Sequence, residues 1–122
     1  MAKKILIVDD DKAVADLLAI QLKELGYETG YVNDGVAALN QVHHDSPDLV
    51  ILDVMLPQMD GFKVCRLLKF DQKFKKIPII LFTSLSEETN GKTGEGVGAD
   101  AYFPKPFEMN KLLGKVKELI KD

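Results

Sequence analysis

One short apolar run, which ends in an acid, constrains the fold of this chain more than any other feature. It comprises residues 49–52 and is followed directly by Asp53. The run is aliphatic and only four residues long, which indicates a strand buried on both faces, as in a parallel sheet. Pro57 and the pair Asp60-Gly61 come next and predict a turn. Open parallel α/β sheets bind their ligands at the carboxyl ends of the strands. Asp53 is therefore predicted to lie where such a sheet carries a functional acid.

Strand-like and helix-like segments alternate along the rest of the chain. Four further segments of strand length lie at residues 5–8, 27–32, 77–82 and 101–103, of which 27–32 is polar enough for an edge. The segments between and after the strands predict five helices, over residues 14–25, 36–42, 62–68, 86–98 and 109–120. Five strands that alternate with five helices through short connections predict a single doubly wound parallel α/β sheet. The length of 122 residues predicts one domain over residues 1–122.

Composition argues against several classes of protein. The formal net charge of −3 gives no reason to expect a nucleic-acid partner. The apolar run near the N-terminus, residues 5–8, is too short for a signal peptide or a membrane span, so we expect a soluble intracellular protein. The single cysteine, Cys65, cannot form an internal disulfide, which favours a reducing cytoplasm.

Five polar side chains follow the predicted strands at one edge of the sheet. They are Asp9 and Asp10 after the first strand, Asp53 after the third, Thr83 after the fourth and Lys105 after the fifth. Carboxylates crowded together repel each other unless a cation lies between them, and carboxylate oxygens suit Mg²⁺. A carboxylate held near Mg²⁺, with an ammonium group and a hydroxyl beside it, is equipped to attack a phosphoryl group. The set predicts phosphoryl chemistry on an aspartate.

Each of these residues also has a purely structural explanation. An aspartate after a strand often caps a helix or a turn, which is our interpretation of Asp11 and Asp34. Thr83 alone would suit a helix cap, and Lys105 alone would suit a solvated charge. The convergence of all five candidates on one edge of the sheet favours the functional interpretation.

The candidate residues lie in motifs that resemble the response-regulator receiver domain. The motifs are Val8-Asp9-Asp10, Leu52-Asp53 with Pro57 and Asp60-Gly61, Phe82-Thr83-Ser84, and Gly98-Ala99-Asp100 with Tyr102 and Lys105-Pro106-Phe107. The match runs from about residue 3 to the C-terminus, in the order and spacing of the family. It implies the flavodoxin-like (βα)5 fold of chemotaxis regulators, with strand order 2-1-3-4-5.

The resemblance implies a phosphoacceptor in a two-component phosphorelay. Asp53 would receive a phosphoryl group from a sensor histidine kinase or a histidine phosphotransfer protein. Asp10, Asp53 and the backbone carbonyl of Met55 would bind Mg²⁺, and Asp9 would help through a water molecule. The protein would catalyse only its own phosphorylation and dephosphorylation, so it would not be an enzyme with a separate substrate.

The resemblance also implies how the signal leaves the site. Thr83 and Lys105 would contact the phosphoryl group, with Lys105-Pro106 as a cis peptide. Tyr102 would turn inward when Thr83 moves, and the face formed by the fourth helix, fifth strand and fifth helix would bind a downstream protein or output domain. The glycine-rich segment 86–98 is a poor helix former, so we expect it to be mobile before phosphorylation. Neither direct nucleic-acid binding nor membrane insertion is expected.

Two other classes of protein share part of this pattern. An aspartyl-phosphate phosphatase also begins with a strand and Asp-x-Asp, which Asp9 and Asp11 match, but it needs a further acidic pair after the lysine, where only Glu108 lies close by. A flavin-binding flavodoxin needs a loop rich in hydroxyl groups and glycine after the first strand, where this chain has three aspartates. The sequence leaves open the cognate kinase and whether the receiver acts alone or within a longer regulator.

Overall fold

The computed structural model describes residues 2–83 and 98–120. In this part of the chain, five parallel strands form one sheet in the order β2-β1-β3-β4-β5. The strands are β1 (Lys4–Val8), β2 (Glu28–Val32), β3 (Leu49–Asp53), β4 (Ile79–Thr83) and β5 (Ala101–Pro104). The predicted doubly wound sheet and its strand order are therefore confirmed.

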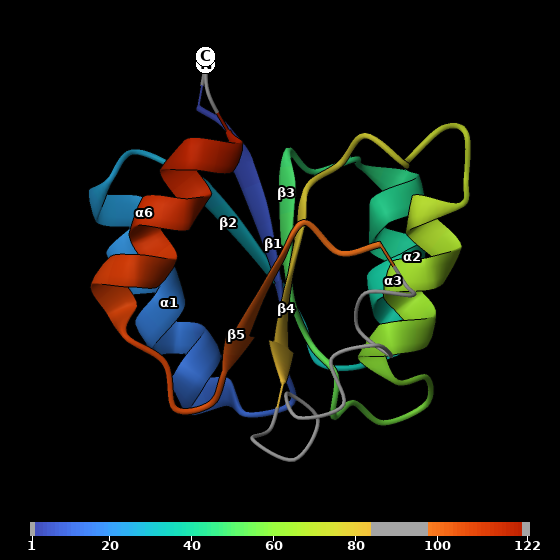
Figure 1. The fold of residues 1–122 in the computed structure, drawn as a ribbon, viewed down its shortest axis with the longest axis horizontal. Helices are drawn as coiled ribbons and strands as arrows, with labels where there is room; N and C mark the ends of the chain where they lie inside the picture. The colour runs from blue at the N-terminus through green and yellow to red at the C-terminus, as the bar shows by residue number, and fades with distance from the viewer. Residues whose placement is uncertain (1, 84–97, 121–122) are drawn as a thin grey trace.

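The helices of the described residues lie on both faces of this sheet. They are α1 (Lys12–Glu24), α2 (Gly35–His44), α3 (Gly61–Lys69) and α6 (Met109–Leu119). Figure 1 shows α1 and α6 on one face and α2 and α3 on the other. The helix predicted over residues 86–98, and the mobility expected of it, lie outside the described residues except for Gly98. None of the helices in residues 2–83 and 98–120 is long and apolar enough to cross a membrane.

The central strands contribute side chains to two separate hydrophobic layers, one on each face of the sheet. They are therefore buried on both faces. In β1, Leu6 and Val8 pack with α2 and α3, whereas Ile5 and Ile7 pack with α1 and α6. Successive side chains of a strand point to opposite faces, so a strand covered on both sides needs an unbroken apolar run. The edge strand β2 instead carries the exposed residues Glu28 and Tyr31, as its polar sequence predicts.

Acidic side chains cap the helices that follow β1, β2 and β3. Asp11 accepts hydrogen bonds from the first backbone N–H groups of α1, and Asp34 accepts one in α2, which confirms the structural interpretation of both residues. Asp60 caps α3 in the same way. A side-chain oxygen at this position satisfies an N–H group that has no partner within the helix. These caps fix the loops at the carboxyl edge of the sheet.

The turn after β3 folds back tightly against the end of its own strand. The Gly61 N–H group donates to the Val54 carbonyl at 3.0 Å. A Cβ atom on Gly61 would lie 2.2 Å from the carbonyl oxygen of Asp53 and 2.7 Å from Cα of Val54. Only glycine allows this close approach, which explains why Gly61 follows Asp60 in the turn after β3.

Candidate functional site

The predicted site residues meet at the carboxyl edge of the sheet, which is the lower edge in Figure 1. Asp9 follows β1, Asp53 ends β3, Thr83 ends β4 and Lys105 follows β5. In residues 2–83 and 98–120, the buried polar and charged side chains are those of Asp9, Asp53 and Thr83. All three belong to this edge. Buried polar groups require partners, so their concentration at one place indicates a binding site for a charged ligand.

Lys105 reaches into the site and joins two of the carboxylates. Its Nζ atom lies 2.8 Å from Oδ2 of Asp9 and 3.0 Å from Oδ2 of Asp53. Its backbone N–H donates to the Thr83 carbonyl at 2.8 Å, which ties the segment after β5 to the end of β4. The peptide Lys105-Pro106 is cis, which confirms the expectation from the family. The lysine that the sequence places after the fifth strand is therefore an internal counter-ion.

The electrostatics of the site differ from those of exposed groups. Burial raises the pKa of Asp53 above its ordinary value of 3.8, although hydrogen bonds from Lys105 and from the Met55 N–H oppose this effect. Burial would lower the pKa of Lys105, but its bonds to Asp9 and Asp53 outweigh burial and raise that pKa above 10.5. Lys105 is thus cationic at neutral pH, and one ammonium group faces a cluster of three acids.

These acids form an oxygen-donor set suited to a metal ion. Asp9, Asp10 and Asp53 each offer one carboxylate oxygen, and the three atoms lie within 4.8 Å of one another. The exposed position of Asp10 opens the set to water, and Mg²⁺ usually keeps several water ligands beside one or two carboxylates. The donor chemistry therefore fits Mg²⁺. Met55 lies in the turn beside this set, where its N–H donates to Oδ1 of Asp53 at 3.1 Å.

Thr83 contributes a hydroxyl group at the same edge. Its Oγ1 atom is buried and has no hydrogen-bond partner within the described part of the chain. A buried polar atom without a partner is rare and needs an explanation, and an arriving anionic oxygen would supply the missing acceptor. Tyr102 lies on β5 opposite Leu81 of β4. Its side chain is 36% exposed, so it belongs to the surface beside the site.

One side chain that contacts the site was not found from the sequence. The hydroxyl of Tyr31, on the edge strand β2, donates to the backbone carbonyl of Asp9 at 2.8 Å. A single aromatic residue near the end of a polar strand has no periodic or motif signal, so sequence reasoning could not select it. The bond becomes visible only when β1 and β2 are placed side by side.

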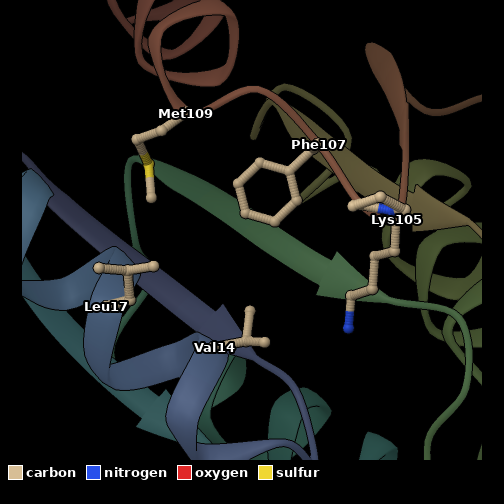
Figure 2. A pocket seen from close by; sticks show the side chains of 6 residues that line it. Val14, Leu17, Lys105, Phe107 and Met109 are labelled. Atoms are coloured by element: carbon tan, nitrogen blue, oxygen red, sulfur yellow. The ribbon is translucent and has the colours of Figure 1, made fainter.

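An apolar groove borders the site next to Lys105. It has a volume of about 520 Å³ and is lined by Val14, Leu17, Lys105, Pro106, Phe107 and Met109. Figure 2 shows Val14 and Leu17 of α1 facing Phe107 and Met109, with the Lys105 side chain beside them. Leu17 is 50% exposed, although it lies beside this apolar surface. The groove is therefore a solvent-exposed apolar surface next to the acidic cluster.

Sequence comparison identifies relatives over nearly the whole chain. The family model of the response regulator receiver domain matches residues 5–117. The DNA-binding dual master transcriptional regulator RpaA of Synechocystis sp. is 38% identical over 118 residues, which are 97% of this chain and 49% of that protein. The chain thus spans about half the length of this curated relative.

Structural comparison agrees with the sequence match. The receiver domain of a signal transduction histidine kinase from Syntrophus aciditrophicus has a TM-score of 0.91 at 39% identity, covering 97% of this chain and 89% of that one. The chemotaxis response regulator CheY4 of Vibrio cholerae has a TM-score of 0.90 at 28% identity, covering 98% of this chain and 100% of that one. Fold, site motifs and comparisons agree, and the chain belongs to the receiver-domain family of two-component response regulators.

Proposed function

We propose that this receiver domain, over residues 1–122, accepts a phosphoryl group on Asp53 in a reaction that requires Mg²⁺. The donor is a phosphohistidine of a sensor histidine kinase or of a histidine phosphotransfer protein. The observation that carries the proposal is the 3.0 Å contact between Lys105 and Asp53 beside two further acids. This arrangement gives a carboxylate nucleophile both a permanent cation and a set of metal ligands.

The reaction is a displacement at phosphorus. A carboxylate oxygen of Asp53 forms a new P–O bond while the P–N bond of the donor histidine breaks, and the electron pair of that bond returns to the imidazole ring. Lys105 donates a charge-assisted hydrogen bond to a phosphoryl oxygen, and the buried Thr83 hydroxyl donates to another. The charge that develops on the transferred group is thus met by groups already in place.

The metal site uses the carboxylates of Asp10 and Asp53 and the backbone carbonyl of Met55. Bound Mg²⁺ supplies further neutralisation of the phosphoryl oxygens. Asp9 would act through a water molecule, as the resemblance to the family implies; its Oδ2 atom lies 2.8 Å from Lys105 Nζ, and its Oδ1 atom accepts the Asp11 N–H at 2.9 Å. The protein has no separate substrate and catalyses only its own phosphorylation and dephosphorylation.

The position of Asp11 argues against the phosphatase alternative. In that alternative the first acid of the Asp-x-Asp pair is the nucleophile, and the second belongs to the same site. Asp11 instead directs its carboxylate to the start of α1, where Oδ1 accepts the Ala13 N–H at 3.1 Å. The Asp11 side chain therefore caps the helix and does not join the site. This favours Asp53 over Asp9 as the nucleophile.

The partners follow from the surfaces around the site. In this proposal the phosphodonor lies over the apolar groove, because the groove is lined in part by Lys105, which contacts Asp53. Phosphorylation draws Thr83 toward Asp53 and turns Tyr102 inward, which changes the face formed by β5 and α6. That face binds a downstream protein or an output domain.

The domain itself binds no nucleic acid and inserts into no membrane. It acts in the cytoplasm, where the buried thiol of Cys65 stays reduced.

Phosphorylation by acetyl phosphate tests the assignment without a known kinase. With Mg²⁺ present, intact-mass measurement should show the addition of one phosphoryl group to the wild-type protein and none to Asp53→Asn. Asp16→Asn, a change of an exposed acid in α1, should be labelled like wild type. Labelling of Asp53→Asn at the wild-type rate would rule out Asp53 as the acceptor.

A further inference from the structure

The loop that carries the metal ligands is tied to the edge strand β2 at two points. Tyr31 is the penultimate residue of β2 and pairs with Ile7 of β1. Its hydroxyl donates to the Asp9 carbonyl at 2.8 Å. The Asp9 N–H donates to the Val32 carbonyl at 3.3 Å. The backbone of Asp9 is therefore held on both sides by the end of β2.

The acid that follows is held in a different way. Asp10 is exposed, and within residues 2–83 and 98–120 no hydrogen bond to its carboxylate is found. The Asp9 carbonyl and the Asp10 N–H belong to one planar peptide unit. A donor that fixes this carbonyl also fixes the direction in which Cα of Asp10 leaves the strand. Tyr31 is the side chain that supplies such a donor.

We propose that Tyr31 is a positioning residue for the Mg²⁺ site. Its hydroxyl holds the Asp9-Asp10 peptide so that the Asp10 carboxylate stays beside Asp53 before the ion binds. A ligand set that is already ordered binds more tightly because less ordering has to accompany binding. This inference rests on the proposed Mg²⁺ site, and it assigns a role in that site to a residue of the edge strand.

The variant Tyr31→Phe removes the hydroxyl and keeps the ring. Tyr27→Phe is the matched control, because Tyr27 lies just before the opposite end of β2. We expect the dissociation constant for Mg²⁺, measured by calorimetry, to rise about threefold to tenfold in Tyr31→Phe, the range of one hydrogen bond. It should stay at the wild-type value in Tyr27→Phe. In the metal-free protein, the amide resonances of Asp10 and Asp11 should shift in Tyr31→Phe alone.

Two further measurements separate positioning from a purely structural role. The urea midpoint of metal-free Tyr31→Phe should change no more than that of Tyr27→Phe. The rate of acetyl-phosphate labelling at saturating Mg²⁺ should stay near wild type, while the Mg²⁺ concentration for half-maximal rate rises. Unchanged Mg²⁺ affinity in Tyr31→Phe would overturn the positioning role alone. Failure of the wild-type protein to bind Mg²⁺ would overturn the proposed metal site and this inference with it.

Discussion

Lys105 Nζ lies 3.0 Å from the carboxylate of Asp53, although 52 residues separate them in the chain. The lysine is held by its backbone bond to Thr83 and by the second carboxylate, Asp9, so its position does not depend on Asp53 alone. The ammonium that now pairs with the carboxylate is thus available to pair with a phosphoryl group attached to it. Under the proposed function, the resting site already contains the counter-ion of its phosphorylated product.

Replacement of Lys105 by Met should destabilise the metal-free protein. Asp9 and Asp53 would remain buried without their shared cation, and removal of one partner of a buried ion pair is costly. The Lys105 side chain is 30% exposed, so we expect a loss of roughly 1–3 kcal/mol in the free energy of unfolding, below the full cost of a wholly buried pair. Urea denaturation measures it.

Mg²⁺ should recover part of this loss, because the ion supplies the missing positive charge. Lys111→Met is the matched control, since Lys111 forms an exposed ion pair with Glu108. Its stability should stay close to wild type with and without Mg²⁺. Equal stability of the two lysine variants in the absence of metal would show that Lys105 is not the counter-ion of the site.

Asp53→Asn should stabilise the metal-free protein at neutral pH. Burial raises the pKa of Asp53 above 3.8, so the folded state binds a proton in a pH range where the unfolded state has lost it. The free energy of unfolding of the wild type therefore falls as pH rises through that range. Asparagine has no such charge to bury, so its advantage should shrink as pH is lowered toward 3.8. Urea denaturation in the presence of a chelator tests this prediction, and an Asn variant less stable than wild type at neutral pH would contradict it.

Gly61→Ala should destabilise the turn that follows Asp53. The new Cβ atom would lie 2.2 Å from the Asp53 carbonyl oxygen, and the main chain must shift to relieve the clash. We expect the free energy of unfolding to fall by about 2 kcal/mol or more, with slower labelling by acetyl phosphate. Gly114→Ala is the control in α6, where a Cβ atom meets nothing within 4 Å. It should raise stability by up to about 1 kcal/mol. Equal effects of the two variants, measured by thermal denaturation, would contradict the packing argument.

Leu17→Glu should separate the two routes of phosphorylation. Leu17 lines the apolar groove and is 50% exposed, so a carboxylate there would be tolerated by the fold but would face the proposed phosphodonor. Transfer from a sensor kinase that phosphorylates the wild type should become about tenfold slower, as for the loss of one apolar anchor. Labelling by acetyl phosphate should not change. Leu67→Glu, at a 45% exposed position of α3, should leave both rates unchanged, and a similar loss in both variants would remove the groove from the docking surface.

The sequence predicts the sheet and its caps because their signals are local. A strand covered on both faces needs a continuous apolar run, as residues 5–8, 49–52 and 79–82 provide in β1, β3 and β4. An acid before a helix has one frequent role, which Asp11 and Asp34 fulfil. The grouping of Asp9, Asp10 and Asp53 follows from parallel topology alone, because side chains at the carboxyl ends of neighbouring strands must converge.

The contacts that shape the site were not predictable in this way. The pairing of Lys105 with Asp9 depends on the side-chain conformation of a flexible lysine, and the bond from Tyr31 to Asp9 depends on the register of two strands. The absence of a partner for the buried Thr83 hydroxyl, among the described residues, likewise appears only in three dimensions. The motifs and the topology predict which residues form the site. Which of these residues contact one another in the resting protein depends on side-chain geometry, which the sequence does not show.

Peptide mapping of the wild-type protein after reaction with acetyl phosphate and Mg²⁺ tests whether Asp53 is the residue that accepts the phosphoryl group. The three acids of the cluster lie within 4.8 Å of one another, so only identification of the modified residue distinguishes them. We expect one phosphoryl group, on Asp53, and none when Mg²⁺ is removed by a chelator. A phosphoryl group on Asp9, as in the phosphatase alternative, or labelling of Asp53 that is equally fast without Mg²⁺, would contradict this expectation.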